Sequence, residues 1–139
     1  MIGLIIVAHG SLAEALLRAT EHVVGPQPNA HAVAIEPSDD LRTRQAEINA
    51  LVAEADQGAG VIVITDMFGG SPANLALGAT ATPGVEVVYG ANLPLLVKLA
   101  KSRERPMEEA VRSALEAGRK YIDSAASILD PGGSARAER

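Results

Sequence analysis

Residues 4–17 read LIIVAHGSLAEALL, and this stretch decides the fold class. Leu4–Ala8 is a short, continuous apolar run of the kind found in strands that are covered on both faces. Ser11 and Glu14 then have the spacing of a capping box, which predicts a helix with Ser11 as its N-cap. His9, one of only three histidines, lies between the two elements. We therefore predict a buried strand, a turn that carries His9, and a helix.

The same alternation of strand and helix continues along the chain. Further strands are predicted at His31–Ile35, Val61–Thr65 and Val85–Tyr89. Helices are predicted from Ser11 to about Gly25, across residues 41–55, from an N-cap at Ser71, from an N-cap at Asn92, and from Pro106 to about Ile128. This order predicts an α/β layered fold with a parallel sheet and right-handed crossovers.

Composition narrows the class of protein. A length of 139 residues suits one domain, which we place at residues 1–129, and the Gly-rich polar tail at 130–139 is predicted to be disordered. A formal charge of −5 argues against a nucleic-acid binder, and the absence of cysteine excludes thiolate chemistry. The apolar start lacks the features of a signal peptide, and no segment is long enough to span a bilayer. We therefore expect a cytoplasmic protein.

Polar and glycine residues follow three of the predicted strands. They are His9, Gly10 and Ser11 after the first strand, Asp66 to Pro72 after the third, and Gly90, Ala91 and Asn92 after the fourth. Ligands of open α/β sheets bind beyond the carboxyl ends of the strands. If the first and third strands are neighbours, about 4.8 Å apart, His9 and Asp66 project into the same crevice.

This combination of residues predicts phosphate chemistry on His9. A carboxylate at Asp66 would hold one ring nitrogen as N–H and leave the other with its lone pair outward, as in a nucleophile, a metal ligand or a general base. Gly69 and Gly70 let backbone N–H groups face the same space, and a helix that begins at Ser71 attracts anions. Each residue also has a plainer interpretation: a boundary histidine, a turn aspartate and an ordinary GGSP turn.

The remaining charged residues predict no second site. His22 lies near the end of the first helix and His31 begins the second strand, at the opposite end of the sheet from His9, so both are expected to be structural. A basic cluster is expected to be a solvated face, with docking to an acidic partner as the alternative. Its members are Lys98, Lys101, Arg103 and Arg105.

Three blocks of sequence are similar to a known family. IIVAHGSLAEALL, VIVITDMFGGSPANLA and VVYGANLPLLVKL together resemble the IIA component of the mannose family of the bacterial sugar phosphotransferase system. The resemblance covers roughly residues 2–125, with the blocks in the family's order. Its most specific part is TDMFGGSPAN.

The resemblance implies a fold, an activity and partners. The fold would be a doubly wound, mainly parallel four-stranded sheet in the order 2-1-3-4, with helices on both faces and, as a variant, an added edge strand. A phosphohistidine on the carrier HPr would donate to His9, which would pass the group to a separate IIB protein. The chain would be a homodimer that associates peripherally with a membrane IIC/IID transporter, and it would use no cofactor and no metal.

The resemblance also assigns residues to the site. His9 matches the phosphorylated histidine, and Asp66 matches the carboxylate that orients it. The residues that would bind phosphate are Gly10, Gly69, Gly70, Ser71 and Asn92. The residue after Asp66 is often Thr or Ser in this family but is Met67 here, which removes a hydroxyl donor.

The sequence leaves two alternative functions to consider. Small tetrapyrrole metal chelatases also end a first strand with HGS, but they use a second histidine at another strand end, and this chain has none after His31. The domain could instead be a phosphorylation-dependent regulatory sensor or the phosphodonor of a dihydroxyacetone kinase. No P-loop or G-x-G-x-x-G motif is present, which argues against binding of ATP or a dinucleotide.

Overall fold

A computed structural model describes residues 1–129 of the chain, so the predicted tail at 130–139 lies outside the described residues. The elements are β1 (Gly3–His9), α1 (Leu12–Val24), β2 (Ala30–Ile35), α2 (Leu41–Ala55), β3 (Val61–Thr65), α3 (Gly70–Gly78), a 3₁₀ turn (Ala79–Ala81), β4 (Val85–Val88), α4 (Leu93–Ala100), α5 (Met107–Lys120) and α6 (Ala125–Leu129). The predicted α/β alternation is confirmed.

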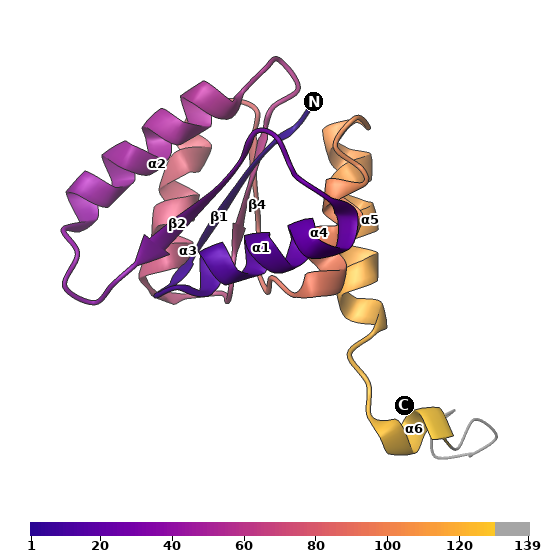
Figure 1. The fold of residues 1–139 in the computed structure, drawn as a ribbon. Coiled ribbons are helices and arrows are strands. Elements are labelled where there is room, and N and C mark those ends of the chain that lie inside the picture. The colour runs from indigo at the N-terminus through magenta and orange to yellow at the C-terminus, as the bar shows by residue number, and fades with distance from the viewer. Residues whose placement is uncertain (130–139) are drawn as a thin grey trace.

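The four strands form one parallel sheet in the order β2-β1-β3-β4, as predicted (Figure 1). The two central strands, β1 and β3, are buried over almost their whole length. Val7 pairs with Thr65 across β1 and β3, so the two strands end side by side at the carboxyl edge. The strand order reverses between β1 and β3: the chain passes from β1 to β2 on one side of β1, and β3 pairs with β1 on its other side.

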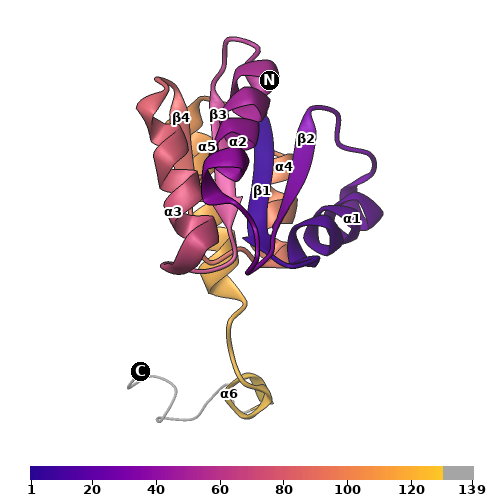
Figure 2. The same ribbon diagram turned by 90° about the vertical axis from the view of Figure 1, so that its left-hand side faces the viewer.

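Helices cover both faces of the sheet (Figures 1 and 2). Leu4, Ile6 and Ala8 of β1 pack in one core with α1, α4 and α5. The alternate residues Ile5 and Val7 pack in a second core with α2 and α3. Since successive side chains of a strand point to opposite faces, a continuous apolar run is what a strand between two cores needs.

Two helix starts differ from the prediction. Ser11 precedes α1, but its side chain makes no cap hydrogen bond, and Glu14 pairs with Arg18 at 3.3 Å. The turn through Gly10 at φ +56° leaves Ser11 with a ψ of 6°, which is not the extended conformation of a capping residue. The third helix begins at Gly70, so Ser71 is its second residue and not its N-cap.

The predicted long fifth helix is two helices. The first, α5, ends at Lys120, and α6 begins at Ala125 after a short connection. Ser124 explains the new start, because its Oγ accepts a hydrogen bond from the backbone N–H of Ser127 at 3.2 Å. In Figures 1 and 2, α6 stands away from the two layers, beyond the carboxyl edge of the sheet.

Arg103 does not belong to a solvated face, which corrects the predicted basic cluster. Its side chain is 3% exposed and donates to the carbonyl oxygens of Ile2 and Asn29, at 2.9 and 2.8 Å, and to Oε1 of Gln27 at 3.2 Å. These bonds tie the loop after α4 to the amino edge of the sheet, opposite the end where His9 lies. Lys98, Lys101 and Arg105 are on the exposed surface, as predicted.

None of the helices within residues 1–129 has the length and hydropathy that crossing a bilayer would require.

Candidate functional site

The parallel sheet brings His9 and Asp66 together. His9 is the last residue of β1, and Asp66 follows directly after β3. The β1–β3 register ends at Val7 and Thr65, so both residues extend past the same edge. The backbone N–H of His9 donates to Oδ2 of Asp66 at 3.1 Å, where the carbonyl of another strand residue would otherwise accept.

The two side chains also make a direct contact. Nδ1 of His9 lies 2.7 Å from Oδ2 of Asp66, so this one oxygen accepts two hydrogen bonds from the same histidine. Oδ1 of Asp66 accepts from the backbone N–H of Met67 at 3.0 Å. The carboxylate is therefore held on both oxygens, and its side chain is 12% exposed whereas that of His9 is 52% exposed.

These contacts determine which nitrogen of the ring is reactive. Burial acts to raise the pKa of Asp66, but the hydrogen bonds from the His9 ring and backbone together leave that pKa below its ordinary value. Asp66 is therefore ionised at neutral pH and can only accept hydrogen bonds. Nδ1 of a neutral His9 must carry the proton, and Nε2 has its lone pair free. The ring is set up to use Nε2 as a nucleophile.

The start of α3 lies beside Nε2. A Cβ added to Gly70 would sit 3.6 Å from Nε2, and Gly70 has a φ of +82°, which L side chains rarely adopt. The first N–H groups of a helix have no partner inside the helix, and Pro72 at the third position has no N–H to offer. The N–H groups of Gly70 and Ser71 are thus the donors at this helix start.

Gly10 and Asn92 are already hydrogen-bonded to other groups. The N–H of Gly10 donates to the carbonyl of Ile35 at 3.0 Å. Asn92 caps α4, as predicted: its Oδ1 accepts from the N–H of Leu95 at 3.0 Å, and its Nδ2 donates to the carbonyl of Gly118 at 2.9 Å. A direct contact of either residue with phosphate stays a prediction.

Sequence reasoning missed Thr65 as a support of the site. Thr65 is fully buried at the end of β3, and its Oγ1 donates to the carbonyl of Met67 at 3.4 Å. Its own carbonyl accepts from the N–H of Ala91 at 3.0 Å, which ties the loop after β4 to the loop after β3. A polar residue at the end of an apolar strand was the available signal.

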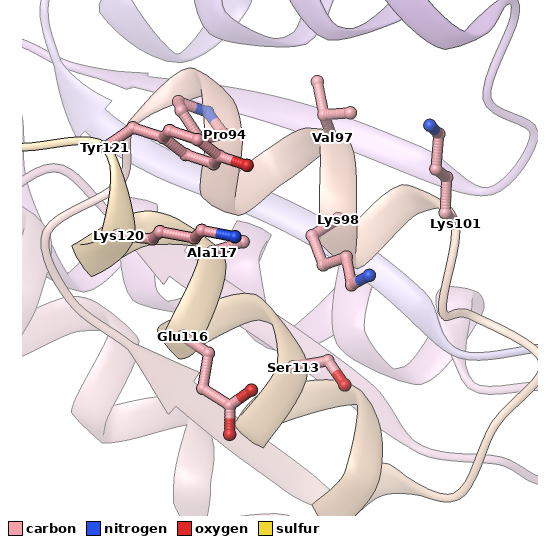
Figure 3. Close-up of a pocket in the computed structure, with 9 residues that line it drawn as sticks. All are labelled: Pro94, Val97, Lys98, Lys101, Ser113, Glu116, Ala117, Lys120 and Tyr121. Carbon is pink, nitrogen blue, oxygen red and sulfur yellow. The ribbon is translucent and has the colours of Figure 1, made fainter.

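The lysines of the basic cluster border a pocket away from His9. This pocket has a volume of about 350 Å³ and lies between α4 and α5 (Figure 3). Lys98, Lys101 and Lys120 line it, and Nζ of Lys120 lies 5.4 Å from the ring centre of Tyr121. Neither His9 nor Asp66 is among its lining residues.

Comparison with known sequences identifies relatives. Residues 3–116 match the family model described as the PTS system fructose IIA component. The chain is 34% identical over 124 residues to the PTS system mannose-specific EIIAB component of Escherichia coli K12, covering 87% of this chain and 38% of that protein. It is 31% identical over 98 residues to the sorbose-specific EIIA component of Lacticaseibacillus casei, covering 70% of each. The chain thus spans well under half the length of the EIIAB relative.

Solved structures share the fold. A mannose/sorbose-specific IIA subunit from Enterococcus faecalis superposes with a TM-score of 0.79 at 30% identity, covering 88% of this chain and 93% of that one. Component EIIA from Streptococcus agalactiae superposes with a TM-score of 0.82, covering 91% and 99%, and its 22% identity supports the likeness of fold alone.

Fold and site together define a class of α/β protein that exposes a carboxylate-held histidine at the carboxyl edge of its sheet. The chain belongs to the EIIA family of the phosphotransferase system (PTS), in its mannose, fructose and sorbose branch. This membership leaves the chelatase alternative without support.

Proposed function

We propose that His9 accepts a phosphoryl group from phospho-HPr on Nε2 and passes it to a IIB protein. One observation carries this proposal: the 2.7 Å contact between Nδ1 and Asp66 leaves Nε2 as the free nitrogen of a half-exposed ring. A ring held in this way meets its donor in a single orientation, which is the main requirement of phosphoryl transfer.

The proposed transfer needs no cofactor, because one P–N bond forms as another P–N bond breaks. The lone pair of Nε2 forms the new P–N bond, while the electron pair of the breaking P–N bond returns to the donor's imidazole. The donor ring, protonated on its other nitrogen, leaves as neutral imidazole, and the His9 ring becomes a phosphoimidazolium that keeps its proton on Nδ1. Asp66 faces that proton and stabilises the positive charge as it develops. The reverse sequence delivers the group to the acceptor.

The phosphoryl oxygens would be held by the start of α3. The N–H groups of Gly70 and Ser71 and the hydroxyl of Ser71 belong to this helix start, which lies beside Nε2, and Gly69 with a φ of +91° forms the turn that precedes it. Gly10 and Asn92 contribute by shaping the two neighbouring loops.

The function is tested by reconstituting the relay. We expect the full chain, incubated with phosphoenolpyruvate, enzyme I and HPr, to gain one phosphoryl group, located on His9 by mass spectrometry. The group should be lost in acid and retained in alkali, as a phosphoramidate bond behaves. Omission of HPr is the control and should prevent labelling. A label that survives acid and is lost in alkali would contradict the proposal.

The cellular setting follows from the relay. HPr and IIB proteins act in the cytoplasm, so we place the chain there, in peripheral association with a membrane IIC/IID transporter. The relatives are named for mannose, sorbose and fructose, but the proposed IIA step handles only the phosphoryl group and does not contact the sugar.

We also propose that the chain is a homodimer. Tyr121 and Ile122, just after α5, and Ile128 and Leu129 of α6 are exposed apolar residues. In Figure 1, α6 stands away from both layers. Such a segment gains buried area by packing against a second copy.

Sedimentation velocity tests the dimer. We expect the wild-type chain to sediment as a dimer and the double variant Ile128→Asp/Leu129→Asp to sediment as a monomer, because two charges would then have to be buried in the interface. Val23→Asp, on an exposed apolar residue of α1, is the matched control and should remain a dimer. A wild-type monomer would refute the proposal.

A further inference from the structure

All the lysines of the chain line the pocket between α4 and α5. They are Lys98, Lys101 and Lys120, and the other members of the 12 Lys and Arg residues are all arginines. The volume of about 350 Å³ lies in the range of small-molecule sites. Because the chain carries a net charge of −5, this pocket is a local concentration of positive charge in an acidic protein.

One face of each helix builds the pocket. Along both helices the lining residues recur at positions i, i+3, i+4 and i+7, which lie on the same side of a helix. They are Pro94, Val97, Lys98 and Lys101 from α4 and its C-terminal end, and Ser113, Glu116, Ala117 and Lys120 from α5, with Tyr121 just beyond. Ser113 and Ala117 are small, so α5 leaves a hollow where it faces α4 (Figure 3).

Contacts beside the pocket hold its two walls together. Nδ2 of Asn92, the cap of α4, donates to the carbonyl of Gly118 in α5 at 2.9 Å. A Cβ added to Gly118 would lie 3.1 Å from the side chain of Leu95, so the helices approach each other closely here. The walls are therefore in place before a ligand arrives, and a pre-formed site loses less free energy to ordering when it binds.

The lysine amines of the pocket have no carboxylate partner. None of the ion pairs formed within residues 1–129 includes a lysine. Figure 3 shows Lys120 and Tyr121 toward one end of the pocket and Lys98 and Lys101 toward the other. Nζ of Lys120 lies 5.4 Å from the ring centre of Tyr121, a cation–π contact that orients the amine. An anionic ligand would thus meet positive charge from both helices.

We propose that this pocket binds a small phosphorylated sugar. Lysine is a common phosphate ligand, because its ammonium is a compact charge with three donors. Glu116 also lines the pocket, and its carboxylate would repel a ligand that is anionic throughout but would accept hydrogen bonds from sugar hydroxyls. Pro94 and Val97 supply an apolar surface for the carbon skeleton of the sugar.

The proposed sugar-phosphate pocket is separate from the chemistry of His9. Neither His9 nor Asp66 lines it, so binding there neither requires nor implies phosphoryl transfer.

A titration followed by NMR tests both the ligand and its place. Glucose 6-phosphate would be added to the ¹⁵N-labelled full-length chain, with glucose and inorganic phosphate as separate probes. The variants are Lys98→Gln and Lys120→Gln. Arg119→Gln is the matched control, since Arg119 is the exposed neighbour of Lys120 and lines a different groove, on the side of α5 that faces β4. All three side chains are exposed, so each variant should keep the wild-type spectrum away from its own position.

We expect glucose 6-phosphate to bind saturably and to shift the amide signals of Val97, Ser113 and Ala117. Lys98→Gln and Lys120→Gln should each raise Kd about tenfold, the usual scale for loss of a hydrogen bond from a charged group. Arg119→Gln should leave Kd within about twofold of the wild type, because it changes the net charge by the same amount outside the pocket. Glucose and inorganic phosphate should each bind at least about tenfold more weakly than glucose 6-phosphate.

Four results would overturn the sugar-phosphate pocket. Shifts that grow linearly without saturation would mean that no site exists, and equal weakening by Arg119→Gln would mean that only the overall charge matters. Inorganic phosphate that binds as tightly as glucose 6-phosphate would show that the sugar is not recognised. Shifts confined to Gly70 and Ser71 would place the ligand at the start of α3 and not between α4 and α5.

Discussion

His9→Ala is expected to abolish phosphorylation of this chain. The variant removes the only imidazole at the carboxyl edge of the sheet, and no other nucleophilic side chain contacts Asp66 within residues 1–129. With phosphoenolpyruvate, enzyme I and HPr, mass spectrometry should detect no phosphorylated chain. The fold should survive, since the side chain is half exposed and lies at a strand end.

The other two histidines provide matched controls for this result. His22 lies near the end of α1, and His31 pairs with Ile5, four residues before the position where His9 pairs with Ile35. Both are therefore remote from Asp66, and His22→Ala and His31→Ala should be labelled at the wild-type rate. Phosphate on His22 or His31 in the wild-type chain would contradict the assignment of His9.

Asp66→Asn is expected to slow transfer roughly 10²–10³-fold, the usual range for removal of one stabilising group from a transition state. An amide can still meet Nδ1, but it has no charge to balance the imidazolium that forms when phosphorus bonds to Nε2. The loss should appear in kcat, with KM for phospho-HPr little changed. Rapid-quench measurement of His9 phosphorylation separates the two. A normal kcat would show that Asp66 has no part in the reaction.

The same substitution has a pH-dependent effect on stability. The pKa of Asp66 is lowered in the folded chain from an ordinary value of 3.8, so its ionised form stabilises the fold above that value. The stabilisation is lost as the pH falls through the lower folded pKa, where Asp66 becomes neutral like asparagine. Urea unfolding should therefore show a difference between wild type and Asp66→Asn at pH 7 that shrinks toward pH 3. A difference that is constant over this range would mean that the pKa of Asp66 is the same in the folded and the unfolded chain.

Much of the site could be predicted because it depends on strand ends. Apolar runs before His9 and Asp66 indicated two strands covered on both faces, and parallel pairing then requires their ends to meet. Asn92 was predicted as a cap and is one. These inferences hold because each depends on local pattern and on one rule of sheet geometry.

The errors arise where a neighbouring turn or a distant part of the chain overrides local preference. Ser11 has a capping-box sequence, but the turn through Gly10 gives it the wrong backbone conformation. Arg103 looks like a surface residue in its sequence neighbourhood, and only the folded chain brings it to the carbonyls of Ile2 and Asn29. The contact between Phe68 and Tyr89 likewise joins two loops that no sequence spacing connects.

The amino-acid sequence by itself determined the order of strands and helices, the parallel sheet, and the pairing of a histidine with an aspartate at one edge. The apolar pattern and the length of each strand or helix can be recognised in a short stretch of sequence, so they can be predicted without the rest of the chain. Only the tertiary structure decided that Nε2, and not Nδ1, faces the start of α3, and that the ring of Phe68 packs on the ring of Tyr89. Both depend on side-chain directions, which are set by packing between segments far apart in the chain.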